Sequence, residues 1–210
     1  MKKVGIYGGS FDPVHKGHMA FAHQAIEQCG LDKVFFLVEP RPRRKQGVKA
    51  LEHRAEMVQL AVAKDPKLGS IWLEQQRFTP HSTLPVLHQR FKGAELHMLM
   101  GDDLLSHFAG ADWPNFDELV RDMRFVIGLR HYSRAEVEHR LDIIQQTTGL
   151  TLRYTLFQSS LPEFSSSTIR QSIKKGHKPR GLSPAVYDYI KQEGLYAGGT
   201  SSGSGVGISS

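Results

Sequence analysis

Two histidines, His15 and His18, lie three positions apart shortly after a pair of glycines, Gly8 and Gly9. The residues before the glycines alternate as in a β-strand, and residues 19–29 repeat apolar side chains at helical spacing. Glycines at a strand-to-helix turn let backbone N–H groups approach a phosphate, and the helix N-terminus adds unpaired donors and a positive dipole end. Two imidazoles on one face of the first helical turn could hydrogen-bond the phosphate oxygens. The stretch therefore predicts an anion-binding site.

This stretch also allows interpretations other than a phosphate site. A glycine-rich turn is a weak signal by itself, and either histidine could be an ordinary surface residue. The histidine pair could bind a metal ion, but no third ligand follows at a usual spacing, so no metal site made by the protein is predicted.

The composition narrows the class of protein. A chain of 210 residues with 40% hydrophobic residues can form one domain with a small appendage. It has no run of eighteen apolar residues and no apolar signal before the first strand, so we expect a cytoplasmic protein without a membrane span. The single Cys29 falls on the apolar face of the first helix and is expected to be a buried, inert thiol. A net charge of +6 suits a polyanionic small substrate or nucleic acid, or only a soluble surface.

Apolar runs and helical patterns alternate along the rest of the chain. This alternation predicts an α/β fold with a doubly wound, mostly parallel sheet. Thr83 is expected to cap a helix that follows the third strand. The other expected elements are strands at 33–39, 70–73, 95–100, 124–129 and 150–157, and helices at 50–64 (with Arg54 on its apolar stripe), 116–120 and 133–149.

The chain is expected to divide into three parts. Residues 1–160 would form the nucleotide-binding core, and residues 161–196 a small subdomain of two helices over one end of the sheet. Residues 197–210 are rich in glycine and serine and have too little apolar surface to pack, so a disordered tail is predicted.

A second candidate phosphate site lies at the first of those two helices. Ser167 and Thr168 offer hydroxyl groups at its start, and Arg170 adds a planar, permanently charged fork that suits phosphate. Taken alone, this segment is better explained as a helix cap with a surface arginine.

Several segments resemble one enzyme family. Residues 8–18 (G-G-S-F-D-P-V-H-K-G-H) closely resemble the nucleotide-binding segment of the nucleotidylyltransferase superfamily, whose mark is (H/T)-x-G-H. Within that superfamily, the nearest likeness is to the bacterial nicotinate mononucleotide adenylyltransferases. The serine-rich segment at 164–170 is similar to the family's I-S-S-T-x-I-R, Gly101-Asp102-Asp103 to its Gly-x-Asp, and residues 189–196 to its C-terminal helix and G-L-Y ending. The resemblance covers about residues 1–196 and implies a Rossmann-like nucleotidylyltransferase fold.

The resemblance implies transfer of the adenylyl group of ATP to a mononucleotide phosphate, with release of pyrophosphate. The catalytic residues would be His15, His18 and Arg170. Mg²⁺ would enter with ATP, and the partners would be ATP and a pyridine mononucleotide, with nicotinate mononucleotide the first choice. The oligomeric state is open between a monomer and a homo-oligomer. The implied ATP-binding residues are Gly8, Gly9, Ser10, Phe11, His15, His18, Gly101, Asp103, Ser167, Thr168 and Arg170.

The acceptor side departs from the family pattern. The family's P-P-H-K corresponds to P-R-R-K here, so that Lys45 matches and Arg44 replaces the histidine. Of the family's S-Y-T-x-x-T, Thr83 keeps the first threonine, and the tyrosine and the second threonine are lost. The family's W-Y pair has become Trp113-Pro114. The implied acceptor-binding residues are therefore Lys45, Thr83, Trp113 and Arg44, and the acceptor itself is left open.

Two alternatives to this activity remain. The chain could be a nucleotidylyltransferase with a different phosphorylated acceptor. It could also be a non-catalytic module that binds nucleotides or nucleic acid, which the basic segment at 41–49 favours. The pair of His15 and His18 argues against the second alternative, because binding alone does not require both, and nucleic acid is not the expected partner.

Overall fold

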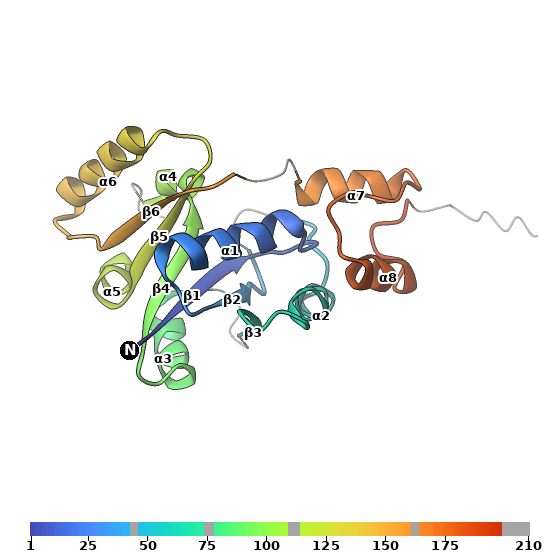
Figure 1. Ribbon diagram of the computed structural model, residues 1–210, viewed down its shortest axis with the longest axis horizontal. Helices are drawn as coiled ribbons and strands as arrows, with labels where there is room; N and C mark the ends of the chain where they lie inside the picture. The colour runs from blue at the N-terminus through green and yellow to red at the C-terminus, as the bar shows by residue number, and fades with distance from the viewer. Residues whose placement is uncertain (43–45, 74–77, 109–113, 161–163, 199–210) are drawn as a thin grey trace, which may run out of the picture.

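One parallel sheet runs through the molecule. The computed structural model describes residues 1–42, 46–73, 78–108, 114–160 and 164–198 of the chain. Within these ranges six strands pair side by side in the order β3-β2-β1-β4-β5-β6, and every pair is parallel (Figure 1). This confirms the predicted doubly wound α/β class, with parallel pairing throughout the described sheet. The strands are β1 (Lys2–Gly9), β2 (Lys33–Val38), β3 (Leu68–Trp72), β4 (Ala94–Gly101), β5 (Arg124–Leu129) and β6 (Tyr154–Gln158).

Helices connect the strands and follow the last one. They are α1 (Lys16–Cys29), α2 (Leu51–Val62), α3 (Pro80–Arg90), α4 (Leu105–Phe108), α5 (Phe116–Asp122), α6 (Arg134–Thr148), α7 (Ser166–Lys174) and α8 (Pro184–Gln192). A short 3₁₀ turn, Asp102–Leu104, and α4 follow β4 directly, and the sequence patterns did not reveal them.

The predicted cap of α3 was wrong. The helix begins four residues earlier than expected, because Thr79 accepts the N–H of Ser82 and Pro80 occupies the first turn, where its missing N–H costs nothing. Thr83 lies inside the helix and is fully buried.

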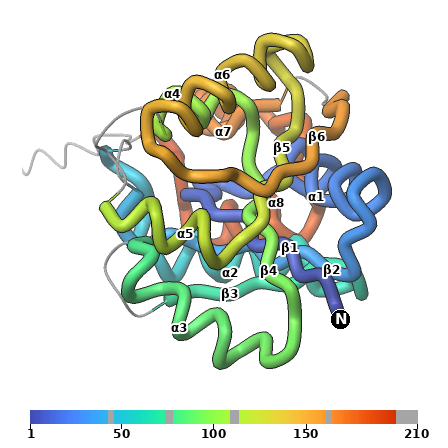
Figure 2. The backbone as a smooth tube through the Cα atoms, turned by 90° about the vertical axis from the view of Figure 1, so that its left-hand side faces the viewer, coloured from blue at the N-terminus to red at the C-terminus, as the bar shows by residue number. Residues whose placement is uncertain are grey.

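Strand side chains alternate between two layers of helices. Leu96, Met98 and Met100 of β4 face the layer that contains α3 and α5, whereas Leu99 faces the layer that contains α1 and α2. Figure 2 shows the two layers, with α3 and α5 on one side of the sheet and α1 on the other. A sheet that is covered on both faces explains why its strands read as nearly continuous apolar runs.

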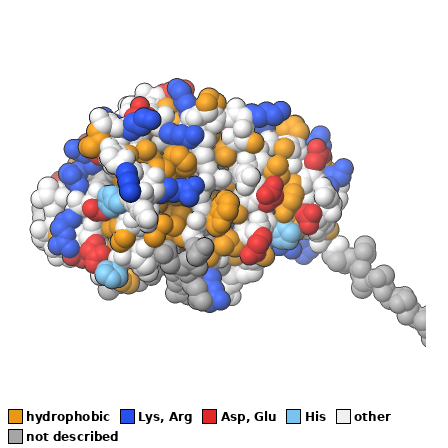
Figure 3. Space-filling view, turned by 90° about the horizontal axis from the view of Figure 1, so that it is seen from below, with side chains coloured by type: hydrophobic (Ala, Val, Ile, Leu, Met, Phe, Trp, Pro, Cys, Tyr) orange, Lys and Arg blue, Asp and Glu red, His pale blue; other side chains and the backbone are white. Residues whose placement is uncertain are grey.

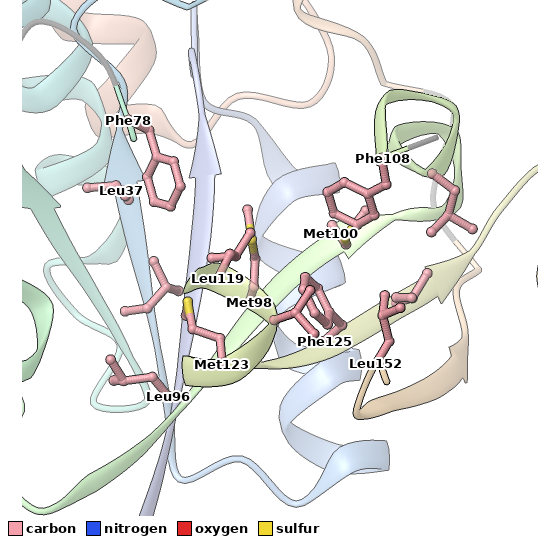
Figure 4. Close-up of a cluster of buried hydrophobic side chains, with 14 of the residues drawn as sticks. Leu37, Phe78, Leu96, Met98, Met100, Phe108, Leu119, Met123, Phe125 and Leu152 are labelled. Carbon is pink, nitrogen blue, oxygen red and sulfur yellow. The ribbon is translucent and has the colours of Figure 1, made fainter. Parts of the chain in front are cut away.

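The larger cluster of buried side chains lies between β4, β5 and the helices on their outer face. Figure 4 shows Met98 and Met123 side by side, with Phe125 and Phe108 in the same cluster. The rings of Phe125 and Phe108 meet edge to face, with centroids 5.5 Å apart. Burying each of these side chains contributes about 1.5–3 kcal/mol to folding. This rigid core fixes the ends of β4 and β5, from which functional loops start.

A second cluster of buried side chains lies on the other face of the sheet, and the two C-terminal helices belong to it. Ile169 of α7 and Val186 and Ile190 of α8 pack with side chains of α1 and α2. In Figure 1 both helices lie beyond the end of the sheet, beside α1 and α2. The boundary predicted near residue 160 stays a prediction, and most of the predicted tail, residues 199–210, lies outside the described residues.

Two expectations drawn from composition can be compared with the structure. No helix among the described residues is long and apolar enough to cross a membrane. Cys29 is half-buried, not fully buried as expected, and burial raises the pKa of its thiol to about 11. The thiol is therefore protonated near neutral pH, which agrees with the expected low reactivity.

Candidate active site

A pocket of about 640 Å³ opens at the carboxyl ends of β1 and β4. The strand order reverses between these two strands, and in open α/β sheets ligands bind at such a switch point. Of the predicted ATP-binding residues, Gly8, Gly9, Ser10, Phe11, His18, Gly101 and Asp103 line the pocket. The other lining residues are Ile6, Tyr7, Leu37, Glu39, Pro42, Phe78, Met98, Leu99, Leu104, His107, Met123 and Arg130.

The two histidines meet at the start of α1. His15 is the extended residue before the helix, and His18 belongs to its first turn. Their rings stack with centroids 3.7 Å apart, as the shared-face prediction required. The backbone N–H of His15 donates to Nδ1 of His18 at 3.2 Å. Because Nδ1 accepts this bond, the proton of a neutral His18 ring is on Nε2, which makes Nε2 a hydrogen-bond donor on a residue that lines the pocket.

Gly17 gives the His15 ring the space it occupies. A Cβ atom on Gly17 would lie 2.9 Å from Nδ1 of His15, closer than such atoms approach each other. The ring has little freedom to move away, because it is 8% exposed and stacks on His18.

We expect Gly17→Ala to lower the turnover of the enzyme about tenfold or more, because the added methyl group displaces His15 and, through the stack, His18. Steady-state kinetics of four proteins test this: wild type, Gly17→Ala, His15→Ala and the double variant. In the His15→Ala background the methyl group meets no ring, so Gly17→Ala should cost little there. Equal losses in both backgrounds would contradict the explanation.

A buried arginine supports the loop of residues 10–16, which joins β1 to α1 and includes the first residue of that helix. Arg54 of α2 is 1% exposed. Its guanidinium donates to four backbone carbonyl oxygens, those of Lys49 (2.7 Å), Ser10 (2.9 Å), Glu39 (2.7 Å) and Pro40 (2.9 Å). Burial lowers the pKa of the guanidinium, although nearby acidic groups oppose the shift. The guanidinium of Arg54 thus holds the ends of β1 and β2 together by hydrogen bonds to the residues that follow each strand.

Helix α7 contacts the same loop from the other side. Arg170 donates from Nη1 to the backbone carbonyl of Asp12 at 2.7 Å, and the hydroxyl of Ser166 donates to the carbonyl of Pro13 at 3.0 Å. The tertiary structure therefore brings together the two segments that the sequence had suggested as phosphate sites. His15 belongs to the loop itself, and Ser167, Thr168 and Arg170 belong to α7. None of these four residues is among those that line the pocket.

A buried carboxylate joins the ends of β4 and β5. Oδ2 of Asp102 accepts the backbone N–H groups of Arg130, His131 and Tyr132 at 2.8 to 2.9 Å. Burial pushes the pKa of Asp102 upward, but the three hydrogen bonds together outweigh it and the pKa is lowered. Asp102 is thus structural, whereas its neighbour Asp103 is exposed and lines the pocket.

Pocket residues that sequence reasoning missed include Tyr7, His107 and Arg130. The guanidinium of Arg130 lies 3.9 Å from the centre of the Phe21 ring and donates to the hydroxyl of Tyr7 at 3.5 Å. Burial raises the pKa of Tyr7. Arg130 directly follows a predicted buried strand, and that position was the signal that could have found it. His107 was expected to be a surface residue and is a half-buried part of the pocket wall.

Of the four predicted acceptor-binding residues, only Thr83 is among the residues that the structure describes. Arg44, Lys45 and Trp113 lie outside the described residues. Thr83 is fully buried, its hydroxyl oxygen accepts the N–H of Thr79 at 3.3 Å, and it does not line the pocket.

The fold and the pocket define a nucleotidyltransferase of the Rossmann-like type. The sequence profile of the cytidylyltransferase-like family matches residues 6–172, and the chain belongs to this family. It is 31% identical over 204 residues to the nicotinate-nucleotide adenylyltransferase of Bacillus subtilis, covering 93% of this chain and 99% of that protein.

Solved structures of low sequence identity confirm the fold. Nicotinic acid mononucleotide adenylyltransferase of Plasmodium falciparum, complexed with NaAD, superposes with a TM-score of 0.73 at 19% identity. The same enzyme complexed with APC gives a TM-score of 0.71 at 18% identity. Each comparison covers 93% of this chain and 98% of the other.

Proposed function

We propose that the protein transfers the adenylyl group of ATP to the phosphate of nicotinate mononucleotide and releases pyrophosphate. The observation that carries this proposal is the histidine pair at the start of α1, in which His18 lines the pocket and accepts the His15 N–H at Nδ1. Full-length similarity to the Bacillus subtilis enzyme supports the choice of substrate.

The reaction needs positioning and positive charge more than it needs a base. The acceptor phosphate is already an anion, so it can attack the α-phosphorus of ATP without losing a proton to the protein. Two bound reactants held in line turn a bimolecular step into an effectively unimolecular one. His18 and His15 would donate to the non-bridging oxygens of the α-phosphate, where negative charge must be stabilised.

The other predicted residues fit the leaving group and the nucleoside. Backbone groups of Gly8, Gly9 and Ser10 would hold phosphate at the end of β1. Arg170, with Ser167 and Thr168 beside it, would hold the β- and γ-phosphates that leave as pyrophosphate. Asp103, which lines the pocket, would contact the bound nucleotide.

Mg²⁺ carried in with ATP fits this site, because Asp103 offers a carboxylate oxygen in the pocket wall and Mg²⁺ prefers oxygen ligands. Among the described residues, Asp103 also belongs to a group with Asp102 and His131 whose ligand atoms lie within 4.8 Å of one another. When bound, the ion would supply positive charge to the triphosphate.

The acceptor half of the proposal has its own support. Arg130 and His107 bring cationic and hydrogen-bonding groups to the pocket, and Phe78 offers an aromatic ring to a pyridine. Three proposed acceptor-binding residues rest on sequence alone: Lys45, Arg44 and Trp113. Thr83 is fully buried and does not line the pocket, so it would act only by supporting residues that do.

Pyrophosphate release from Mg-ATP tests the function. The acceptors are nicotinate mononucleotide, nicotinamide mononucleotide and a non-pyridine mononucleotide at equal concentrations. We expect the highest kcat/KM with nicotinate mononucleotide. If only the non-pyridine phosphate reacts, the acceptor is wrong, and if no acceptor reacts while ATP binds, the enzymatic proposal is wrong.

Nucleic-acid binding has weaker support. On the face shown in Figure 3, Lys and Arg side chains alternate with Asp and Glu side chains, so that this face carries no continuous basic surface. A nucleic-acid site depends on a basic patch or stripe that follows the phosphate backbone.

A further inference from the structure

The last described turn of the chain reaches back to the loop of residues 10–16. The hydroxyl of Tyr196 donates to Oδ1 of Asp12 at 2.6 Å, across 184 positions of sequence. The same oxygen accepts the backbone N–H of Lys49 at 3.3 Å. Oδ2 of Asp12 lies 3.8 Å from Nη1 of Arg170, which also donates to the Asp12 backbone carbonyl. Asp12 therefore contacts both a C-terminal residue and the arginine proposed to hold pyrophosphate.

Both members of the Tyr196–Asp12 pair are held tightly. Asp12 is 3% exposed, so its carboxylate depends on the protein for hydrogen bonds. Burial and the bond to Asp12 raise the pKa of Tyr196 above its ordinary value, so that the hydroxyl remains a donor at physiological pH. The backbone of Tyr196 has φ of 62°, in the left-handed region that costs an L-residue roughly 1–2 kcal/mol. The contacts with Asp12 offset that cost.

We propose that Tyr196 is a positioning residue for ATP, acting through Asp12 on the loop of residues 10–16 and on Arg170. This inference rests on the proposed function and extends it to the C-terminal segment. Tyr196 and Arg170 share the carboxylate of Asp12. When Tyr196 supplies its hydrogen bond, Arg170 stays at 3.8 Å from Oδ2, which leaves its guanidinium available to the leaving phosphates.

The physical reason lies in how a buried carboxylate balances its charge. A buried anion that loses one donor strengthens its interaction with the cation that remains. Without the Tyr196 hydroxyl, Asp12 would draw Arg170 into a closer ion pair, and the loop would lose its hydrogen bond to Tyr196. Both changes weaken binding of the ATP triphosphate and leave the contacts of the acceptor unchanged.

The test compares Tyr196→Phe with a matched control, Tyr189→Phe. The hydroxyl of Tyr189 also joins the C-terminal part to α2, through a 2.8 Å bond to Nδ1 of His53, but it does not touch the loop. We expect Tyr196→Phe to weaken Mg-ATP binding, measured by calorimetry, about tenfold. It should lower kcat/KM for ATP at least as much and leave KM for the acceptor unchanged. Tyr189→Phe should bind Mg-ATP as the wild type does.

Two shortened chains and a second background sharpen the test. A chain ending at Ala197 keeps Tyr196 and should bind Mg-ATP normally, whereas a chain ending at Leu195 should bind it weakly. In an Asp12→Asn background the competing charge is gone, so Tyr196→Phe should have a smaller effect than in the wild type.

The proposal is overturned if Tyr196→Phe binds Mg-ATP like the wild type, or if Tyr189→Phe weakens binding equally with the same change in melting temperature. The second result would mean that Tyr196 only stabilises the fold. Mg-ATP binding needs no acceptor, so it decides the matter even if the wild type transfers adenylyl groups to none of the acceptors offered.

Discussion

His18→Ala is expected to lower kcat by about two orders of magnitude or more. The physical reason is that Nε2 of His18 is the proton-bearing nitrogen, since Nδ1 accepts from the His15 backbone, and one preorganised donor to a transition-state oxyanion contributes about 10²–10³ in rate. His15→Ala should give a similar loss, because its ring stacks on that of His18. Pre-steady-state and steady-state rates of pyrophosphate release provide the measurement.

The control for this experiment is His139→Ala. His139 is an exposed residue of α6 and does not line the pocket. Its removal should leave kcat unchanged, and the melting temperatures of all three variants should stay close to that of the wild type. Near-wild-type turnover in both His18→Ala and His15→Ala would show that the pair is not catalytic.

Arg54→Met is expected to cause the largest loss of stability of any single change at the site. Methionine fills much of the same space but removes the donor to one buried and three part-buried backbone carbonyl oxygens, and a fully buried group left unpaired costs about 1–3 kcal/mol. Relaxation and water entry recover part of this, so we expect a loss of about 3–5 kcal/mol in the free energy of unfolding. For a chain of this length the melting temperature should fall by roughly 10 °C.

Chemical denaturation of Arg54→Met and Arg121→Met measures the difference. Arg121 pairs with Asp117 on the surface of α5, with its side chain 68% exposed, and exposed pairs contribute about 0–1 kcal/mol. A stability of Arg54→Met equal to that of Arg121→Met would refute the structural role of the buried guanidinium. Activity should fall as well, because Ser10 and Glu39 lose their shared support.

Sequence by itself determined the class of fold and the centre of the site. The periodicity of apolar residues is a local property, so it predicted the order of strands and helices and, from that order, a parallel sheet. The phosphate turn was equally readable, because Gly8, Gly9, His15 and His18 lie within one short segment and their meeting follows from the strand-to-helix turn. Residues 164–170 were found through a family resemblance as well as through their types.

Some boundaries were misread where local signals competed. Thr83 was predicted to cap α3, whereas Thr79 is the cap and the proline that follows it occupies the first turn. The short turns that follow β4 have too few residues to show any periodicity.

Only the tertiary structure decided which distant residues support the site. Arg54 reads as one polar residue on an apolar helix stripe, and its four partners come from the ends of β1, β2 and the segment before α2. Arg130 reads as a charge after a strand, and the order of strands sets it beside Tyr7. Tyr196 and Asp12 are 184 positions apart, and no local pattern relates them. Periodicity reports which face of an element is buried, whereas a hydrogen bond across the sheet depends on how whole elements pack, and that information is not local.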